Sequence, residues 1–495
     1  MKADRSSGTR AARFGACEDG FVLVFLAVCI PALIGLVGLA VDGGRLMTLD
    51  TQLAAAADAQ ALAAANRLDR SANAIPAARA AAEALGNRPS LAERLPAGAR
   101  SSYRFAASLY DLQRNPSLSL GDQASDLAVY VEVTTAEASL TTSFLQLVGA
   151  RSLPIRRRAV AESQYYACDV TPMAMCQPDP AAFAATARPG RQYLLRYNGA
   201  KAPGSIALLD RADDPDGRQT LRNLATNAPQ FCYSEGVRLR TNLAPVDYDA
   251  ALDIRFDRYQ GRAGPVAPEL AVFPPAPIVI SGRHLDTCRS SPEGGSILPP
   301  FPLPRDLAYQ DFRLTGAWDS GGGDWKSAPR LGWASESAAT ALEEYIAWNH
   351  GDKPPDVQDR FRQAGTRYEL YLRELGLTPQ TETRPVDTRS YGVSTATVPT
   401  GGPADSPLKE NAVPICYAGN QPATEARRRI VYMTIADCAG FPAAATSANL
   451  SRVVGKFFLT EPSDLGATLV EFIDLVRPTD DDGKLRHVVQ LVTGD

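Results

Sequence analysis

The chain contains one long apolar run, Gly20–Val41, whose 22 residues include no charged side chain. A helix rises about 1.5 Å per residue, so this run reaches roughly 30 Å, the thickness of the hydrocarbon core of a bilayer. The alternative is a cleaved leader, whose apolar region is usually shorter and is followed by a small-residue cleavage site. This run is followed instead by Asp42-Gly43-Gly44-Arg45. The sequence therefore predicts an uncleaved transmembrane helix with Pro31 as a mid-span kink.

The basic residues around the run indicate its orientation. Arg45 alone follows it before Arg67, whereas four basic residues precede it: Lys2, Arg5, Arg10 and Arg13. Because basic residues are retained in the cytoplasm, we expect a single-pass membrane protein with a cytoplasmic N-terminus and the bulk of the chain on the other side of the membrane. The spacing of Ala40 and Gly44 suits close packing of membrane helices, which leaves a homo-oligomer through the anchor open.

Composition narrows the classes of function. The 495 residues carry a net charge of −4 and show no basic stripe, which argues against a nucleic-acid binder. A hydrophobic fraction of 45% is typical of globular proteins, so the part beyond the anchor has enough apolar residues for ordinary cores.

Cysteine usage agrees with an exported segment. Six cysteines lie beyond the anchor, and an even number in such a segment favours disulfides. The closest pair, Cys168 with Cys176, is predicted first, and Cys416 with Cys438, which flank a predicted strand, second. Other pairings and buried free thiols remain alternatives. The full set of candidates is Cys168, Cys176, Cys232, Cys288, Cys416 and Cys438.

An alanine-rich stretch, residues 45–68, predicts that the anchor continues as one long helix. Its leucines form one stripe, for which we expect a contact with another helix; they are Leu46, Leu49, Leu53 and Leu68. Asp42 and Asp58 are interpreted as solvated or capping carboxylates. A second helix is expected over 75–85.

The pattern then changes to strands. Residues 103–110, 127–134 and 155–163 predict a small antiparallel sheet, with 143–148 as a short helical or edge piece. A long helix packed on such a sheet is a pilin-like layout. The fold class is therefore α+β.

A larger β-rich domain is expected from residue 166 onward. Its last strands, at 429–436, 456–460, 469–476 and 486–492, are expected to pair with strands of the 168–260 region. Loops rich in Pro, Gly, Ser or Thr are expected at 261–310 and 379–408. The expected organisation is a cytoplasmic N-terminus (1–19), a transmembrane helix (20–41), a helix-plus-sheet module (42–165) and a β-rich periplasmic domain (166–495).

The sequence shows no catalytic motif. Its three histidines, His284, His350 and His487, are isolated, and Gly-x-Ser-x-Gly and a complete phosphate-binding loop are absent. The acidic turn at 480–482 is interpreted as solvated. We therefore predict no enzyme activity, no metal site and no cofactor.

All four tryptophans fall within 31 residues, from Trp318 through Trp325 and Trp333 to Trp348. Clustered tryptophans build cores and also bind ligands. Packing is the preferred interpretation, and a carbohydrate- or peptide-binding loop is the alternative.

Three features in order carry a family resemblance: the apolar span, AVDGGR at its outer end, and the helix QLAAAADAQALAAA at 52–65. They resemble the TadE/TadG-like family of Tad (Flp) pilus-assembly proteins, of the TadG type. VYVEVTT and FLQLVGARSLPIRRRAVAES, between residues 129 and 163, are similar to the strand region that follows in that family. A metal-dependent adhesion site would need Asp-x-Ser-x-Ser after a strand, which this chain lacks, so none is carried over.

The resemblance implies a single-pass protein of the bacterial inner membrane, with a cytoplasmic N-terminus and a periplasmic bulk, that takes part in pilus assembly in tight adherence, with effects on adhesion and biofilm. It implies contacts with other Tad pilus-assembly proteins, pseudopilins or pilin subunits. The rival hypothesis is a membrane-tethered glycan-binding module or enzyme that uses the Trp318–Trp348 region.

Overall fold

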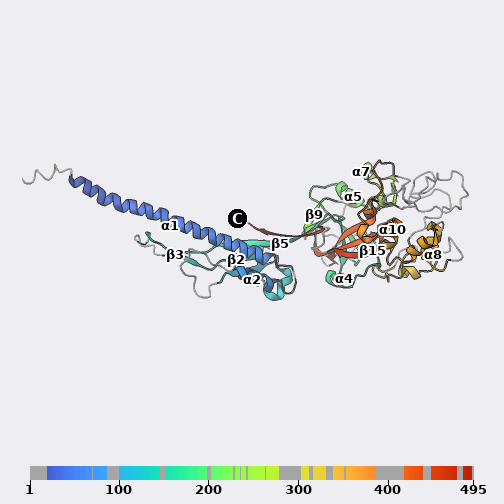
Figure 1. Cartoon of the computed structure of the whole chain (residues 1–495), viewed down its shortest axis with the longest axis horizontal. Helices are drawn as coiled ribbons and strands as arrows, with labels where there is room; N and C mark the ends of the chain where they lie inside the picture. The colour runs from blue at the N-terminus through green and yellow to red at the C-terminus, as the bar shows by residue number, and fades with distance from the viewer. Residues whose placement is uncertain are drawn as a thin grey trace, which may run out of the picture. The chain divides into compact units, whose positions relative to one another are not determined.

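The structure is a computed structural model (Figure 1). It describes residues 19–69, 71–85, 100–144, 146, 152–197, 202–226, 229–234, 236–240, 243–261, 264–277, 303–310, 316–330, 338–350, 353–385, 417–438, 447–476 and 483–492. The chain divides into two compact units. Unit 1 comprises Met1–Gln164 with Val488–Asp495, and unit 2 comprises Tyr165–His487. The fold is α+β, with a long apolar N-terminal helix, further helices, and mainly antiparallel sheets in a larger β-rich region.

Helix α1, Asp19–Ala65, is 47 residues long. The apolar run and the alanine-rich stretch form one continuous helix, as predicted. Pro31 lies inside α1 and does not end it. Within the described part of the chain, the segment Leu23–Ala65 is the one helix that is long and apolar enough to cross a membrane. Its apolar side chains from Leu23 to Val41 are exposed in the isolated chain.

Unit 1 packs the outer half of α1 and helix α2, Ala74–Leu85, on an antiparallel sheet. The order is β1-β2-β5-β16, and the bounds are Ser102–Ala106, Tyr130–Thr134, Arg158–Cys168 and Leu485–Leu491. Alanines of both helices meet Phe105 and valines of β2, because small side chains let helices approach a sheet closely. The predicted strand 103–110 ends early, since Ser108 accepts the N–H of Asp111 and begins helix α3, Leu109–Arg114. A 3-10 helix, η2, follows at Asp122–Leu127.

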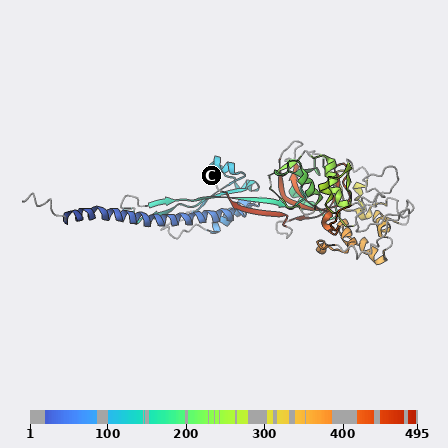
Figure 2. The same ribbon diagram turned by 90° about the horizontal axis from the view of Figure 1, so that it is seen from above.

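A separate hairpin completes unit 1. Its strands are β3, Ala138–Thr141, and β4, Ser152–Ile155, which pair in antiparallel register. Both views place strands of unit 1 alongside the outer half of α1 (Figures 1 and 2).

Unit 2 is built on a seven-stranded sheet of order β10-β8-β6-β13-β14-β15-β7. The bounds in chain order are Met173–Gln177 (β6), Gln192–Arg196 (β7), Ile206–Leu209 (β8), Gly236–Arg240 (β10), Ile430–Asp437 (β13), Ser447–Leu459 (β14) and Ala467–Val476 (β15). The predicted return is confirmed for three of the four late strands: β13 pairs with β6, β14 with β10, and β15 with β7. It is wrong for the fourth, β16, which pairs with β5 in the sheet of unit 1.

Helices cover both faces of this sheet because its side chains alternate between two cores. Along β13, Ile430 and Tyr432 face one core, while Val431 and Met433 face the other. The first core takes side chains from α8, α9 and α10, at Ala341–His350, Pro355–Arg362 and Arg367–Glu374. The second core takes them from α4, α5, α6 and α7, at Pro180–Thr186, Arg218–Ala225, Pro245–Asp253 and Pro268–Ala271. The chain stays helical from α6 through Phe256.

The remaining described elements are short. They are β9 (Cys232–Ser234), which pairs with β5, the pair β11 (Gln260–Gly261) and β12 (Gly264–Pro265), and the 3-10 helices η4 (Ile254–Phe256), η6 (Leu307–Tyr309), η7 (Trp325–Ser327), η8 (Pro379–Thr381) and η9 (Ala426–Arg429). Much of the predicted loops 261–310 and 379–408 lies outside the described residues.

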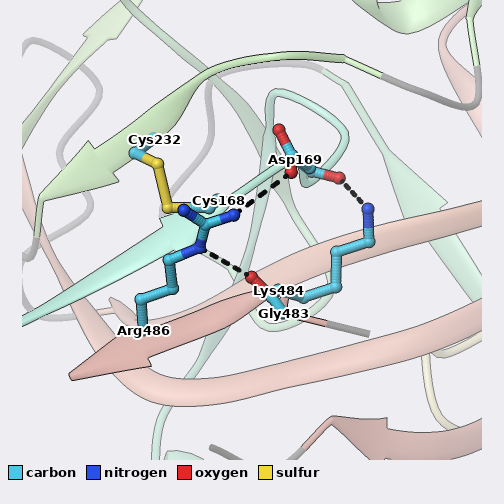
Figure 3. Close-up of a disulfide and its surroundings, with 6 residues drawn as sticks. All are labelled: Cys168, Asp169, Cys232, Gly483, Lys484 and Arg486. Carbon is cyan, nitrogen blue, oxygen red and sulfur yellow. Dashed lines mark hydrogen bonds and ion pairs between the residues drawn. A yellow bond between two sulfur atoms is a disulfide. The ribbon is translucent and has the colours of Figure 1, made fainter. Parts of the chain in front are cut away.

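Two disulfides staple unit 2, and both predicted pairings are wrong. Cys168 bonds to Cys232, and Cys176 bonds to Cys438. Strand register explains both, because Cys168 lies directly opposite Cys232 in the β5–β9 pair, and Ala436, opposite Cys176, is two residues before Cys438. Figure 3 shows the first disulfide beside Lys484, whose Nζ donates to the carbonyl of Asp169 at 2.7 Å. The other two candidates, Cys288 and Cys416, lie outside the described residues.

A fully buried arginine links the sheet of unit 2 to α10. Arg367 pairs with the carboxylates of Asp306 and Glu471, and its Nη1–Oε2 distance to Glu471 is 2.9 Å. Its guanidinium also donates to the carbonyls of Pro304 and Gly190. An arginine suits this place because its planar fork serves several acceptors at once.

Candidate functional site

The segment just beyond the apolar run carries the most specific geometry in unit 1. Asp42 is 1% exposed, and its two carboxylate oxygens accept the backbone N–H groups of Ser143 and Phe144 at 2.9 and 2.8 Å. These two hydrogen bonds hold the segment directly after β3 against α1, and Ser143 is 101 residues from Asp42 in the sequence. A carboxylate that accepts two hydrogen bonds tolerates burial that an isolated charge does not. The expectation of a solvated or helix-capping Asp42 is therefore wrong.

One helical turn before Asp42, α1 meets the side chain of Phe144. A Cβ on Gly38 would overlap the Cβ of Phe144 and lie 3.1 Å from its Cγ. A Cβ on Gly35, by contrast, would meet nothing within 4 Å. Gly38 is therefore required by this contact, which no feature of the sequence had indicated.

The other residues of the Asp-Gly-Gly-Arg motif contribute less. Gly43 and Gly44 have open space where a Cβ would stand. Arg45 donates from Nη1 to the Ser143 hydroxyl at 3.0 Å, which adds a second polar link to the same loop.

Farther along α1, the hairpin covers the leucine stripe. Leu49 and Leu53 are fully buried against Ala138 and Leu140 of β3, so these two leucines contact a strand of their own chain and not another helix. From Asp42 to Leu53 the helix rises about 16 Å, and from residue 143 to 138 a strand covers about the same length. The hairpin therefore runs along α1, with its tip toward the apolar run.

The alanine-rich end of α1 serves packing. Ala57, Ala61 and Ala64 are fully buried against α2 and the sheet, and Asp58 is half-buried between them on the helix. The sequence predicted the helix here, and the structure adds the surface that it covers.

We find no catalytic or metal-binding constellation among the residues that the structure describes. No group of three or more His, Cys, Asp or Glu side chains within this part is placed to hold a metal ion. His350, which has no metal-ligand spacing in the sequence, contacts a distant carboxylate in the fold: its Nε2 lies 2.7 Å from Oε1 of Glu374. The hydroxyl of Tyr345 donates to the same buried oxygen. His487 stacks on Tyr165, and His284 and the acidic turn 480–482 lie outside the described residues.

One partly buried acid in unit 2 has a perturbed proton affinity. Burial raises the pKa of Asp253 to about 7, although Arg258 opposes this shift. Its Oδ1 accepts the N–H of Ser463 at 2.8 Å, and Ser463 also bonds to Asp249. These contacts join α6 to the segment before β15, which indicates a structural role.

The described tryptophans are packed into unit 2. Trp325 is 1% exposed within the first core, and Arg367 lies over its ring. Trp318 is half-buried and stacks on Tyr193, with ring centroids 5.5 Å apart. Trp333 and the side chain of Trp348 lie outside the described residues. The two visible contacts are those of packing.

Comparison with known families connects the geometry of α1 to a function. Residues 20–67 match the family model described as putative Flp pilus-assembly TadE/G-like. We refer to residues 20–67 as the TadE/G-like segment because of this match. The segment coincides with α1 and the turn after it, and it includes both Gly38 and Asp42. No curated protein and no solved structure matches the chain.

The TadE/G-like match confirms the resemblance for the anchor and its helical extension. The resemblance of residues 129–163 stays a prediction. Ser143 and Phe144, the hydrogen-bond partners of Asp42, lie outside the matched segment, and the sequence gave no indication of this contact.

Proposed function

We propose that this chain is a membrane-anchored periplasmic component of Tad/Flp pilus assembly that acts through protein–protein interaction. The observation that carries the proposal is the coincidence of the TadE/G-like segment with α1. A family segment that spans both the apolar run and its outer extension supports a role in which anchor and stalk work together.

Two further features support the proposed location. The excess of basic residues before the apolar run favours a cytoplasmic N-terminus. The disulfides Cys168–Cys232 and Cys176–Cys438 in unit 2 suit an oxidising compartment such as the periplasm. The partners implied are other pilus-assembly proteins, pseudopilins or pilin subunits, and a second copy of the chain through the anchor.

Deletion of the gene tests the role in assembly. We expect loss of surface pili and reduced adhesion and biofilm formation, with recovery when the full chain is supplied from a plasmid. Pili of normal number and length in the deletion strain would refute the proposal.

Topology and partner contacts need separate tests. A periplasm-dependent reporter fused after Arg67 should be active, and a cytoplasm-dependent reporter at the same place should be inactive. Met47 is 73% exposed on α1 just beyond the apolar run, so a photo-crosslinking residue at this position should capture a pilus-assembly protein or a second copy. The same probe at buried Leu49 is the matched control and should capture no other chain.

A further inference from the structure

The tip of the β3–β4 hairpin reaches the membrane-spanning part of α1. Gly38, which contacts Phe144, lies three residues before Val41, where the apolar run ends. At about 1.5 Å per residue, this contact lies roughly 4–5 Å inside the end of the run. Arg45, which bonds to Ser143, lies about 6 Å beyond it. Because the headgroup layer on each side of a bilayer is roughly 5–8 Å thick, these two contacts lie on either side of the boundary between acyl chains and headgroups.

The surroundings of Phe144 at this level are apolar. Val37, Leu39 and Val41 of α1 are 54%, 58% and 44% exposed, as expected of side chains that lipid covers. Phe144 is half-buried, and the side chain of Gln146 is exposed. An aromatic side chain beside exposed aliphatic side chains of α1 is typical of a segment that enters the membrane interface.

We propose that the hairpin tip is a second contact of this protein with the membrane, in which Phe144 lies among lipid acyl chains beside α1. This inference rests on the membrane anchor of the proposed function, because the tip meets lipid only if a bilayer surrounds α1. Asp42 sets the height of the tip by accepting two of its backbone N–H groups. Gly38 sets its lateral position, because the absence of a Cβ lets Phe144 reach the helix.

Photo-crosslinking to lipid tests the inference on the full-length protein. The protein is reconstituted in vesicles of phosphatidylethanolamine and phosphatidylglycerol, with p-benzoyl-phenylalanine at position 144 or 146. The same probe at Arg156, which is exposed at the opposite end of the hairpin, is the matched control. A probe at Leu33, which is 59% exposed within the apolar run, reports on the anchor itself. We expect phospholipid adducts by mass spectrometry at positions 33, 144 and 146 and at least several-fold fewer at 156.

Two glycine variants test the contact between Gly38 and Phe144 while the photo-crosslinking probe stays outside this contact, at position 146. Gly38→Ala should displace Phe144 and reduce the lipid adduct at position 146 several-fold, whereas Gly35→Ala should leave it unchanged. An adduct at position 33 without any at 144 and 146 would refute the hairpin contact and leave the anchor intact. Absence of adducts at all three positions would refute both. Adducts at 144 and 146 to protein alone would assign the tip to a protein interface and overturn the lipid proposal.

Discussion

Replacement of Asp42 by alanine should release the hairpin tip from α1. The variant leaves the N–H groups of Ser143 and Phe144 without their acceptor. A hydrogen bond to a charged group contributes about 1.5–3 kcal/mol, so two bonds contribute about 3–6 kcal/mol, with the lower end applying where water can replace the carboxylate. Because about 1.4 kcal/mol corresponds to a tenfold change in an equilibrium constant, local opening should become at least roughly a hundredfold more frequent.

Hydrogen exchange measures this opening directly. In the full chain reconstituted in lipid nanodiscs, peptides that contain residues 143 and 144 should exchange at least roughly a hundredfold faster in Asp42→Ala, while peptides from β13 keep their rates. Asp58→Ala is the matched control, since Asp58 is a half-buried carboxylate of the same helix for which no hydrogen bond to the hairpin is seen. Unchanged exchange at residues 143 and 144 in Asp42→Ala, or equal acceleration in Asp58→Ala, would refute the reasoning.

Three further predictions concern unit 2. Arg367→Ala leaves two buried carboxylates without their counter-ion and should cost about 3–5 kcal/mol in urea unfolding, whereas Arg373→Ala, which removes a more exposed pair on the same helix, should cost less than about 1 kcal/mol. Cys176→Ser should cost about 2–5 kcal/mol, and adding Cys438→Ser should cost no more, because one disulfide is lost in both cases; a larger loss in the double variant would contradict this pairing. The pKa of Asp253 is about 7 in the folded chain and about 4 in an unfolded one, so the folded state binds the proton more tightly and stability should fall as pH rises between these values; Asp253→Asn should flatten that slope, and an unchanged slope would exclude Asp253 as its source.

The sequence was most informative where the signal is local and periodic. The apolar run of 22 residues and the alanine-rich stretch predicted α1 because length and helix propensity act within one segment. Strands β1, β2 and β5 and the late strands of the chain followed from alternation in the same way, whereas the β3–β4 hairpin was not predicted. The strand expected over 103–110 ends at Ala106 because Ser108 caps the N-terminus of α3 by accepting the N–H of Asp111, and this capping outweighs the β propensity of the segment.

The sequence could not supply contacts between distant segments. Asp42 and Ser143 are separated by 101 residues, and no pattern in either segment indicates that the two are in contact. The disulfide Cys176–Cys438 spans 262 residues and depends on the parallel pairing of β6 with β13, so proximity in sequence favoured the wrong partner. The motif Asp-Gly-Gly-Arg was visible, but its meaning required the fold.

Strand β16 has a consequence for how the protein is made. The chain leaves unit 1 within β5 and returns to it within β16, where the N–H of Val492 donates to the carbonyl of Val160 at 2.8 Å. Unit 2 is thus an insertion in the sequence of unit 1. During synthesis from the N-terminus, the β16 edge of β5 stays open until more than 300 residues of unit 2 have been made. The sheet nearest the anchor in sequence is therefore the last to be completed, and a nascent chain offers that open edge to any chaperone or partner strand that arrives first.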